Sequence, residues 1–368
     1  MPTDFKTLFS RMIAEKASDL FVKVGAPPAL RVAGKVRFVE GAPFTPDTVN
    51  SMFDQVADPR TRAQFDATGE ADTAYELYGV GRFRVNIFRQ RGYIGFVYRH
   101  IQTRIPEMED LNLPAATLKK LASLSRGLVL VTGIAGSGKS TTLASMINHV
   151  NKVQARHVVT IEDPIEYLFV DDKCVIDQRE LGMDTQSFSQ ALKHVVRQSP
   201  DVIMIGEMRD LETVEAAMAA AETGHLVFST LHTVNAMQTV ERIINFFPPH
   251  QHEFLRMQLA LLLEGVVSQR LIPTKEGNAR VPAIELMVAT PTVRELLHEG
   301  KTKELYKALK EGSYFGTQTF NQSLKDLYAR DLITLEEALV AADNPDELKL
   351  DVRGIVKGTK PGDFDFKF

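Results

Sequence analysis

Apolar runs and amphipathic stretches alternate through the middle of the chain, and this alternation predicts strands that alternate with helices. Strands are expected at 127–132, 157–162, 174–178, 201–205 and 226–230. Helices are expected at 140–152, 187–198 and 210–223. Strands that are apolar along their length are typical of a sheet covered by helices on both faces, so the pattern predicts an α/β fold. From about residue 250 onward the pattern is helical.

Residues 1–103 have a different pattern, which predicts a mixed α+β domain. An amphipathic helix leads into a strand near the start of this region. Two short strands are expected on either side of Ala33-Gly34, and residues 82–101 predict a hairpin that turns near Arg91-Gly92. Sheet structure therefore dominates the expected N-terminal domain.

Composition suggests where the domains end. The prolines and acidic residues around 104–112 predict a linker, and a second domain with C-terminal helices is expected at 113–342. Residues 343–368 are rich in proline, glycine and charge, which predicts an extended or mobile tail.

The overall composition is that of a soluble globular protein. Of 368 residues, 44% are hydrophobic and 24% are charged, and this length predicts more than one domain. The single cysteine, Cys174, excludes an internal disulfide and a cysteine-cluster zinc site, and it fits a reducing cytoplasm. No apolar run is long enough to span a bilayer, and the run at 259–267 is interrupted by Glu264, so no membrane insertion is expected. A net charge of −4 gives no general reason to expect nucleic acid as a partner.

The stretch GIAGSGKSTT fits the G-x-x-x-x-G-K-[ST] pattern of a phosphate-binding loop. An apolar strand enters the loop and a helix leaves it, which is the context that the motif requires. Its glycines let backbone N–H groups turn toward phosphates, and the helix N-terminus adds partial positive charge. The nucleotide-binding residues are expected to be Gly133, Gly136, Ser137, Gly138, Lys139, Ser140 and Thr141.

Two residues of this loop have specific expected roles. Lys139 would reach the β- and γ-phosphates, and Ser140 would be a ligand of Mg²⁺. No N-K-x-D guanine signature occurs, because Asn151-Lys152 is followed by Val-Gln. ATP is therefore the expected nucleotide, with Mg²⁺ as its metal ion.

The stretch DVIMIGEMRD places an acid where a hydrolytic site needs one. An apolar strand delivers Glu207 to its carboxyl end, where α/β sheets bind ligands. A carboxylate there can orient or deprotonate the attacking water and hold Mg²⁺ through a water molecule. The plainer interpretation is an acid that caps the next helix, but the spacing from the loop favours the catalytic role.

Two further stretches are ambiguous by themselves. TIEDPIEY carries Glu162, Asp163 and Glu166 after a strand, and GHLVFSTLHT places His225 and His232 at the two ends of a short strand. Taken alone, the acids fit a solvated turn and the histidines fit packing at strand ends.

In order along the chain, these four stretches resemble the Walker A, Asp box, Walker B and His box motifs of the secretion ATPase superfamily. The flanking stretches SDLFVKVGAPPALRVAGKV, GRFRVNIFRQRG and GTQTFNQSLKDLY are similar to the PilT/PilU-type type IV pilus retraction ATPases, the twitching-motility group. The resemblance implies a PAS-like N-terminal domain and a RecA-like P-loop NTPase core with a helical C-terminal region.

The resemblance also implies roles for single residues. Glu207 would be the catalytic carboxylate, and the three acids of the Asp box would organise Mg²⁺ and water. His232 would sense the γ-phosphate, and His225 would support the box. The family supplies arginine fingers from its N-terminal domain, and the candidates here are Arg82, Arg84 and Arg99.

The arginines allow other interpretations. Alternation with apolar residues places Arg82 and Arg84 on one face of a strand, which also fits a solvated face or a nucleic-acid stripe. The acidic net charge weakens the nucleic-acid interpretation.

The implied machine is a cytoplasmic homo-hexamer that turns ATP hydrolysis into domain rotation about the linker and powers pilus retraction. Its implied partners are a platform protein of the inner membrane and a paralogous retraction ATPase hexamer. Assembly ATPases usually carry a tetracysteine zinc element, which one cysteine cannot supply, so retraction is favoured. The stretch TPTVRELLHEGK at 290–301 replaces an AIRNLI-like helix and resembles the accessory, PilU-type branch more than PilT.

Two other functions stay open. One is an ATP-binding regulatory or assembly protein with little turnover of its own, and the other is a DNA-directed P-loop motor. Intact Glu207 disfavours the first, and the absence of an evident basic channel disfavours the second.

Overall fold

The computed structural model describes residues 5–32, 34–101, 104–277 and 279–354. Two units make up the chain. The first runs to Arg104 and includes Pro164–Leu168, and the second comprises Ile105–Asp163 and the chain from Phe169 onward.

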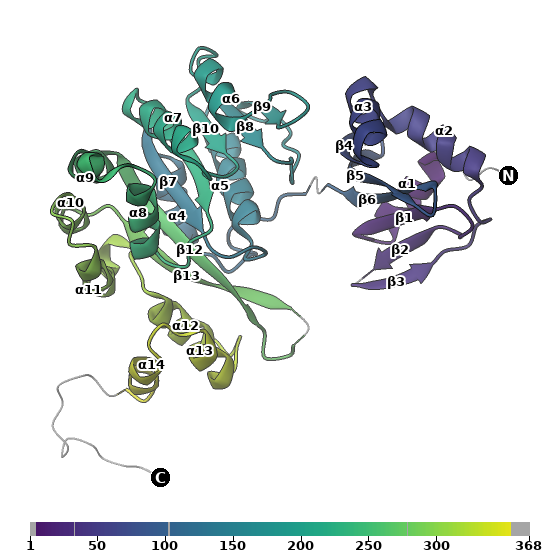
Figure 1. Ribbon diagram of the computed structural model, residues 1–368. Coiled ribbons are helices and arrows are strands. Elements are labelled where there is room, and N and C mark those ends of the chain that lie inside the picture. Colours follow the sequence, from purple (N-terminus) through teal and green to yellow (C-terminus); the bar gives the residue numbers. More distant parts are fainter. Residues whose placement is uncertain (1–4, 33, 102–103, 278, 355–368) are drawn as a thin grey trace, which may run out of the picture. The chain divides into compact units, whose positions relative to one another are not determined.

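The first unit is a six-stranded antiparallel sheet in the order β3-β2-β1-β6-β5-β4. Its strands are β1 (Asp19–Lys23), β2 (Ala29–Val32), β3 (Lys35–Phe38), β4 (Glu70–Leu77), β5 (Gly81–Gln90) and β6 (Tyr93–His100). Its helices are α1 (Phe5–Ala14), α2 (Pro46–Val56) and α3 (Pro59–Thr68). All three helices contribute to one core against the sheet, with Phe9, Phe83 and Tyr98 at its centre (Figure 1). The predicted α+β fold of this region is confirmed.

The predicted hairpin in the first unit is confirmed. It joins β5 to β6 through Arg91 and Gly92, whose φ angles of 50° and 80° are both left-handed. Two consecutive left-handed residues match the twist of the flanking strands, which favours this tight turn. Along β5, Phe83 and Val85 are buried while Arg84 is exposed, so the alternation read from the sequence has set which face carries the arginine.

The second unit is built on a seven-stranded sheet in the order β13-β12-β7-β11-β10-β8-β9. Its strands are β7 (Gly127–Thr132), β8 (His157–Glu162), β9 (Val175–Glu180), β10 (Val202–Ile205), β11 (Leu226–Leu231), β12 (Leu263–Pro273) and β13 (Arg280–Val288). Every strand pair is parallel except β12 with β13.

Helices cover both faces of this sheet. The helices before the C-terminal region are α4 (Ala115–Ala122), α5 (Lys139–Val153), α6 (Phe188–Val195), α7 (Leu211–Glu222), α8 (Ala236–Asn245) and α9 (His252–Leu262). Helices α4 and α5 belong to the core on one face, and α6 to α9 belong to the core on the other. The apolar strands are buried from both sides, and the predicted α/β fold is confirmed.

The expectation that the chain is helical from about residue 250 onward is wrong for two segments, β12 and β13. Residues 263–273 and 280–288 form the antiparallel pair of β12 and β13, and β12 extends the parallel sheet beside β7. The segment is rich in β-branched residues such as Val266, Val267 and Ile272, and all three are buried. Burial on the sheet, and not helical periodicity, decides the structure of this segment.

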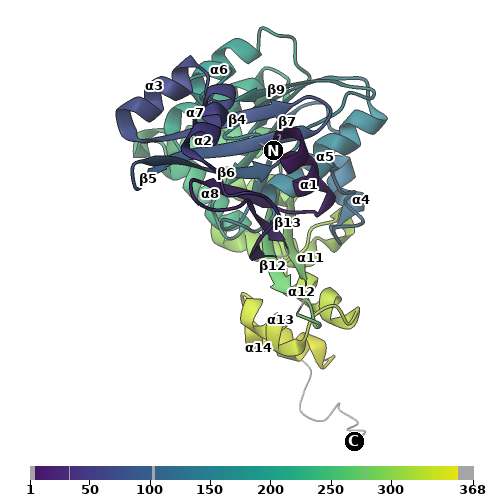
Figure 2. The ribbon, with the colours of Figure 1, turned by 90° about the vertical axis from the view of Figure 1, so that its right-hand side faces the viewer.

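The C-terminal helices are α10 (Pro291–His298), α11 (Leu305–Glu311), α12 (Phe320–Ala329), α13 (Leu335–Ala341) and α14 (Pro345–Val352). Helices α12 to α14 pack together beside the β12–β13 hairpin, as Figures 1 and 2 both show.

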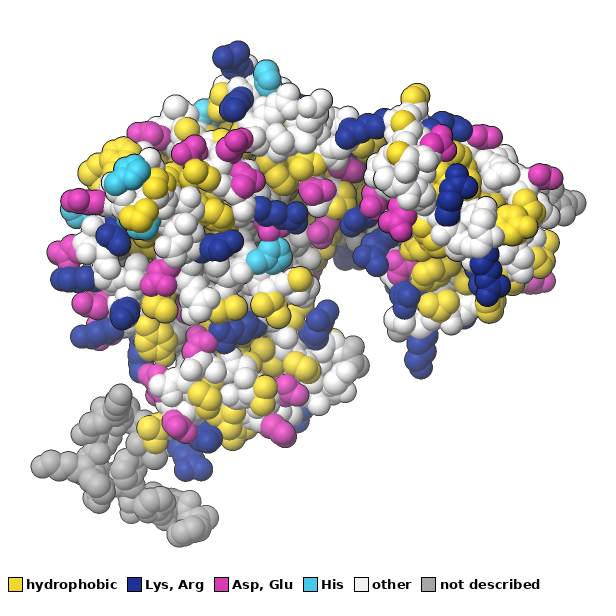
Figure 3. All heavy atoms as spheres, viewed as in Figure 1, with side chains coloured by type: hydrophobic (Ala, Val, Ile, Leu, Met, Phe, Trp, Pro, Cys, Tyr) yellow, Lys and Arg dark blue, Asp and Glu magenta, His cyan; other side chains and the backbone are white. Residues whose placement is uncertain are grey.

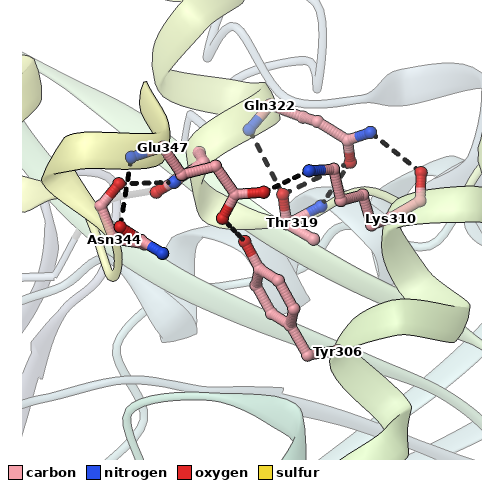
Figure 4. Close-up of polar contacts among 7 residues, drawn as sticks. Tyr306, Lys310, Thr319, Gln322, Asn344 and Glu347 are labelled. Carbon is pink, nitrogen blue, oxygen red and sulfur yellow. Dashed lines mark hydrogen bonds and ion pairs between the residues drawn. The ribbon is translucent and has the colours of Figure 1, made fainter. Parts of the chain in front are cut away.

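The tail predicted to begin at 343 is wrong for its first part, because residues 345–352 form α14. The side chain of Asn344 accepts a bond from the backbone N–H of Glu347, and Leu348 is fully buried. Glu347 accepts a hydrogen bond from Tyr306 Oη at 2.9 Å and pairs with Lys310, which ties α14 to α11 (Figure 4). Burial and this acceptor bond raise the pKa of Tyr306, so its hydroxyl stays protonated. The rest of the predicted tail, 355–368, lies outside the described residues.

The predicted linker is attached to the second unit over much of its length. Met108 is 1% exposed in the core that contains α4 and α5. Ser145 Oγ on α5 donates to the carbonyl oxygen of Pro106 at 2.8 Å, and Glu107 and Glu109 pair with lysines of α5 and α4. Residues 106–109 are therefore part of the second unit, since these contacts fix both their side chains and their backbone.

Candidate active site

The phosphate loop connects β7 to α5, as predicted. Gly133, Gly136 and Gly138 have φ angles of 146°, 75° and 90°, in the region that favours glycine. A Cβ at Gly133 would lie 2.5 Å from both the carbonyl oxygen of Gln269 and Oγ of Ser137. The loop thus passes so close to β12 that no side chain fits at its first position.

The start of α5 offers hydrogen-bond donors to an anion. Among the described residues, the backbone N–H groups of Gly138 and Ser140 have no protein acceptor, and Oγ of Ser137 is buried without a partner. Ser140 and Thr141 lie in the first turn of this 15-residue helix, where the helix dipole is positive. Unpaired donors at a positive helix end suit a phosphate group, so the nucleotide fits this loop.

Lys139 links the loop to the His box. Its Nζ donates to the carbonyl oxygens of Gly133 at 2.9 Å and Ile134 at 3.0 Å, and it lies 3.4 Å from Nδ1 of His232. The side chain is largely buried, so its charge acts in a site with little water.

Glu207 lies at the carboxyl end of β10, as predicted. The N–H of Gly206 donates to the carbonyl oxygen of Ile161 at 2.8 Å, which extends the β8–β10 pairing to the residue before the acid. Oε1 of Glu207 lies 3.2 Å from Nε2 of His232. The Walker A lysine, the His box histidine and the Walker B glutamate therefore form one continuous chain of contacts.

Arg209 holds the other oxygen of this glutamate. Its Nη2 lies 2.8 Å from Oε2 of Glu207. The hydrogen bond to Glu207 and the charges of Glu207 and Asp163 raise the pKa of Arg209. The carboxylate of Glu207 is thus engaged on both oxygens, by an imidazole and by a guanidinium.

The structure separates the three acids of the Asp box. Glu162 is the last residue of β8 and is buried, and its Oε1 accepts from Thr160 Oγ1 at 2.6 Å and from Gln178 Nε2 at 3.1 Å. Asp163 is exposed and acts electrostatically on Arg209. Glu166 is exposed in the segment that belongs to the first unit. The proposed roles of all three in organising Mg²⁺ and water stay predictions.

His225 and His232 lie at the two ends of β11, as predicted, and the role of His225 in supporting the His box stays a prediction. The carbonyl oxygen of His225 accepts from the N–H of Gly127, at the start of β7, whereas the phosphate loop follows the end of β7. Its Nδ1 lies 2.9 Å from the carbonyl oxygen of Ala220 at the end of α7. Because β7 and β11 are parallel, the two histidines that flank β11 lie at opposite edges of the sheet.

The three candidate arginines lie on β5 and β6 of the first unit, on the sheet face opposite α1 to α3. Arg99 Nε donates to Oδ1 of the buried Asp19 at 3.0 Å. Arg82 lies 3.9 Å from Glu76, and Arg84 lies 4.0 Å from Asp72. Each guanidinium is near a carboxylate of its own sheet, and their role as fingers stays a prediction.

One buried residue of the site was not predicted. Gln269 on β12 is 4% exposed, accepts from Thr142 Oγ1 of α5 at 2.7 Å through its Oε1, and lies beside Gly138. Its side chain thereby connects β12 to the end of the phosphate loop and the first turn of α5. The signal that could have found it, a buried-type strand interrupted by one amide, was obscured because the segment was expected to be helical.

The family model described as "Type II/IV secretion system protein" matches residues 97–311. The chain belongs to this family. It is 44% identical to the type IV pilus ATPase PilU of Pseudomonas aeruginosa, over 95% of this chain and 91% of that protein. It is 42% identical to the type IV pilus retraction ATPase PilT of the same organism, over 93% of this chain and 99% of that protein.

Solved structures agree with this placement. The crystal structure of the pilus retraction motor PilT with bound ADP has a TM-score of 0.87 at 44% identity, covering 94% of this chain and 99% of that one. The ATPase DotB of Legionella pneumophila has a TM-score of 0.74 at 27% identity, with 96% of each chain covered. The chain is therefore a nucleotide-binding P-loop secretion ATPase of the PilT/PilU group, as predicted. No helix within the described ranges has the length and apolar character needed to cross a bilayer.

Proposed function

We propose that this secretion ATPase is the motor of a type IV pilus and powers its retraction. Similarity to both PilU and PilT over nearly the whole chain supports the biological role. The observation that supports ATP hydrolysis is the chain of contacts from Lys139 through His232 to Glu207. Hydrolysis of a γ-phosphate needs a group that binds the phosphates and a group that positions the attacking water, and Lys139 and Glu207 are the candidates for these two roles.

In the proposed reaction, Lys139 exchanges its two loop carbonyls for the β- and γ-phosphate oxygens of ATP. The N–H groups of Gly138 and Ser140 bind the same phosphates. Glu207 orients the attacking water and accepts its proton. His232 contacts both Lys139 and Glu207, so it would respond when Lys139 binds the γ-phosphate.

Magnesium is the proposed metal ion of the nucleotide. Within the described ranges no group of three or more His, Cys, Asp or Glu side chains could hold a metal ion. Mg²⁺ commonly binds through phosphate oxygens and few protein ligands, so Ser140 and, through water, Glu207 suffice for it. The ion would offset phosphate charge.

We also propose that a ring completes the site. Arg82, Arg84 and Arg99 would stabilise charge on the γ-phosphoryl group as arginine fingers, within a homo-hexamer. Each is already near a carboxylate of its own sheet, so nucleotide would compete for them with those carboxylates. Rotation between the units would take place before Pro106, because the residues from 106 to 109 are fixed to the second unit.

The proposed partners follow from the role. A platform protein at the inner membrane would recruit the cytoplasmic ring, and a paralogous retraction hexamer would act with it. The stretch at 290–301 favours the accessory, PilU-type branch. Acidic and basic side chains are mixed over the face of the second unit in Figure 3, which gives no support to a nucleic-acid partner on that face.

A second candidate function is an ATP-binding regulator with little turnover of its own. The observation that favours it is the engagement of both carboxylate oxygens of Glu207, by His232 and Arg209. Such a carboxylate must be released before it can act on water.

Retraction of fluorescently labelled pili in the native host tests the proposal. Cells carrying Glu207→Gln should retract fewer pili, or retract them against smaller loads, than cells with the unchanged chain. Each strain is measured with and without the paralogous ATPase, which separates a principal from an accessory motor. Equal retraction by the variant in both backgrounds would exclude the motor function.

A further inference from the structure

A buried carboxylate lies in the second unit outside the motifs that define the site. Glu285 is on β13, is 4% exposed, and is surrounded along its strand by buried apolar residues. Its carboxylate makes no ion pair with the described residues. Burying an acid in this way costs stability, so its single strong contact is informative.

That contact is with the start of α8. The backbone N–H of Ala236 donates to Oε1 of Glu285 at 2.7 Å. The helix already has a local cap, because Oδ1 of Asn235 accepts from the N–H of Gln238. A local cap is enough to begin a helix. The second acceptor, supplied from another strand, fixes where α8 begins relative to the sheet.

The position of α8 matters because its first residue follows the His box. His232 is four positions before Ala236, and the turn between them is tightened by a 2.7 Å bond between the hydroxyls of Thr233 and Thr239. Displacing the start of α8 would therefore move this turn, and with it the imidazole that contacts Glu207.

Glu285 also lies in register with the strand that leads into the phosphate loop. Ser268 on β12 pairs with Glu285, and Thr132 at the end of β7 pairs with Ser268. Thr132 Oγ1 donates to Ser268 Oγ at 3.0 Å. This row of polar residues runs across β13, β12 and β7 and ends at Thr132, the residue before Gly133. Glu285 therefore connects the turn between β11 and α8 with the strand that enters the phosphate loop.

We propose that Glu285 is a positioning residue for ATP hydrolysis, which holds the β11–α8 turn so that His232 bridges Lys139 and Glu207. This inference rests on the proposed roles of His232 and Glu207. The glutamate itself acts only through the turn and need not contact the nucleotide.

Steady-state ATP hydrolysis by the full chain tests the proposal, at protein concentrations where turnover per subunit is constant. Glu285→Ala should lower kcat about tenfold or more with little change in KM, because the phosphate loop keeps its donors. Glu285→Gln keeps an acceptor for the Ala236 N–H and should retain most of the activity. Glu285→Asp is one carbon shorter and should behave like the alanine variant.

A double-mutant comparison separates positioning from general damage. In a His232→Ala background, Glu285→Ala should lower kcat no further than about twofold, since its effect passes through the histidine. Thr290→Ala removes a comparable cap from α10 and serves as the matched control, with kcat unchanged. Faster amide hydrogen exchange at 232–245 in Glu285→Ala should report the released turn.

Each alternative result has a defined meaning. Unchanged kcat in Glu285→Ala, or a further loss of the same size in the His232→Ala background, would overturn the positioning role. Loss of activity in Glu285→Gln as large as in Glu285→Ala would also overturn the positioning role. If the alanine variant does not fold, the activity of Glu285→Gln alone tests this role. If His232→Ala alone leaves kcat unchanged, the proposed role of His232 fails first, and the two failures are thereby distinguished.

Discussion

His232 Nε2 lies 3.2 Å from Oε1 of Glu207, while Nδ1 of the same ring lies 3.4 Å from Nζ of Lys139. A single imidazole therefore connects Lys139 and Glu207, the residues proposed to bind phosphate and to activate water. Since β10 and β11 are adjacent parallel strands, Glu207 after β10 and His232 after β11 lie at the same edge of the sheet. Nucleotide that moves Lys139 can be sensed by Glu207 through this ring.

The first prediction concerns this bridge. His232→Ala should lower kcat about 100-fold, as expected for a lost polar group that acts on the transition state. ADP binding by calorimetry should change little, because the loop donors are intact. A His250→Ala variant controls for loss of a histidine outside the site. A variant with weak ADP binding and normal kcat would contradict the bridging role.

The second prediction concerns the close approach of the phosphate loop to β12. Gly133→Ala places a Cβ 2.5 Å from the carbonyl oxygen of Gln269, whereas a Cβ at Gly136 has nothing within 4 Å. Gly136→Ala carries the strain of a left-handed alanine, about 1–2 kcal/mol. Gly133 has a φ of 146°, where alanine is strained at least as much, so its variant adds the clash to that strain. Gly133→Ala should therefore weaken ADP binding more than about tenfold beyond the loss in Gly136→Ala. Equal losses would show that the approach to β12 is unimportant.

The third prediction concerns the segment before α4. Met108 is 1% exposed, so Met108→Ala should lower the free energy of unfolding by about 2–4 kcal/mol through a core cavity. Glu109→Ala, which removes a solvent-exposed ion pair, should lower the free energy of unfolding much less than Met108→Ala does. Chemical denaturation measures both. A Met108→Ala variant as stable as the unchanged chain would mean that this segment is a free linker after all.

The fourth prediction concerns pH. Burial raises the pKa of Glu285 from 4.5 to about 7, with the Asp343 charge acting in the same direction and the Ala236 N–H and Arg270 opposing it. The folded state thus holds a proton that the unfolded state releases, so the stability from this group is complete below pH 4.5 and lost as pH rises through about 7.

The comparison is between the unchanged chain and Glu285→Gln, which does not titrate. Between pH 4.5 and 8 the free energy of unfolding of the unchanged chain should fall by about 3 kcal/mol more than that of the variant, at 1.36 kcal/mol per pKa unit. Parallel pH curves for the two proteins would mean that Glu285 titrates as an ordinary acid.

Much of the second unit could be predicted because its signals are local. Apolar strands and the spacing of Gly133, Gly138 and Lys139 need no knowledge of distant residues. Glu207 could be placed for the same reason, since the end of a buried strand in a parallel sheet is where ligands bind.

Other features depend on register and packing. Gln269 contacts the phosphate loop and Glu285 contacts the start of α8, both from strands β12 and β13. The apolar residues of these strands also fit a helix, and only pairing in the sheet decides between the two structures. The two histidines that flank β11 could be placed at opposite ends of a strand, but the contacts of each depend on neighbouring elements that the sequence alone does not specify. Helix α14 depends on tertiary contacts of Leu348 and Glu347, which could not be predicted from its proline- and charge-rich sequence.

The most direct test of the account is ATP hydrolysis by the purified chain as a function of protein concentration, with Glu207→Gln beside it. The account predicts that the rate rises more than linearly with concentration as subunits complete each other's sites. It also predicts that the variant is at least about 100-fold slower at every concentration while still binding ADP. A variant that hydrolyses ATP within a few-fold of the unchanged chain would contradict the central role of Glu207.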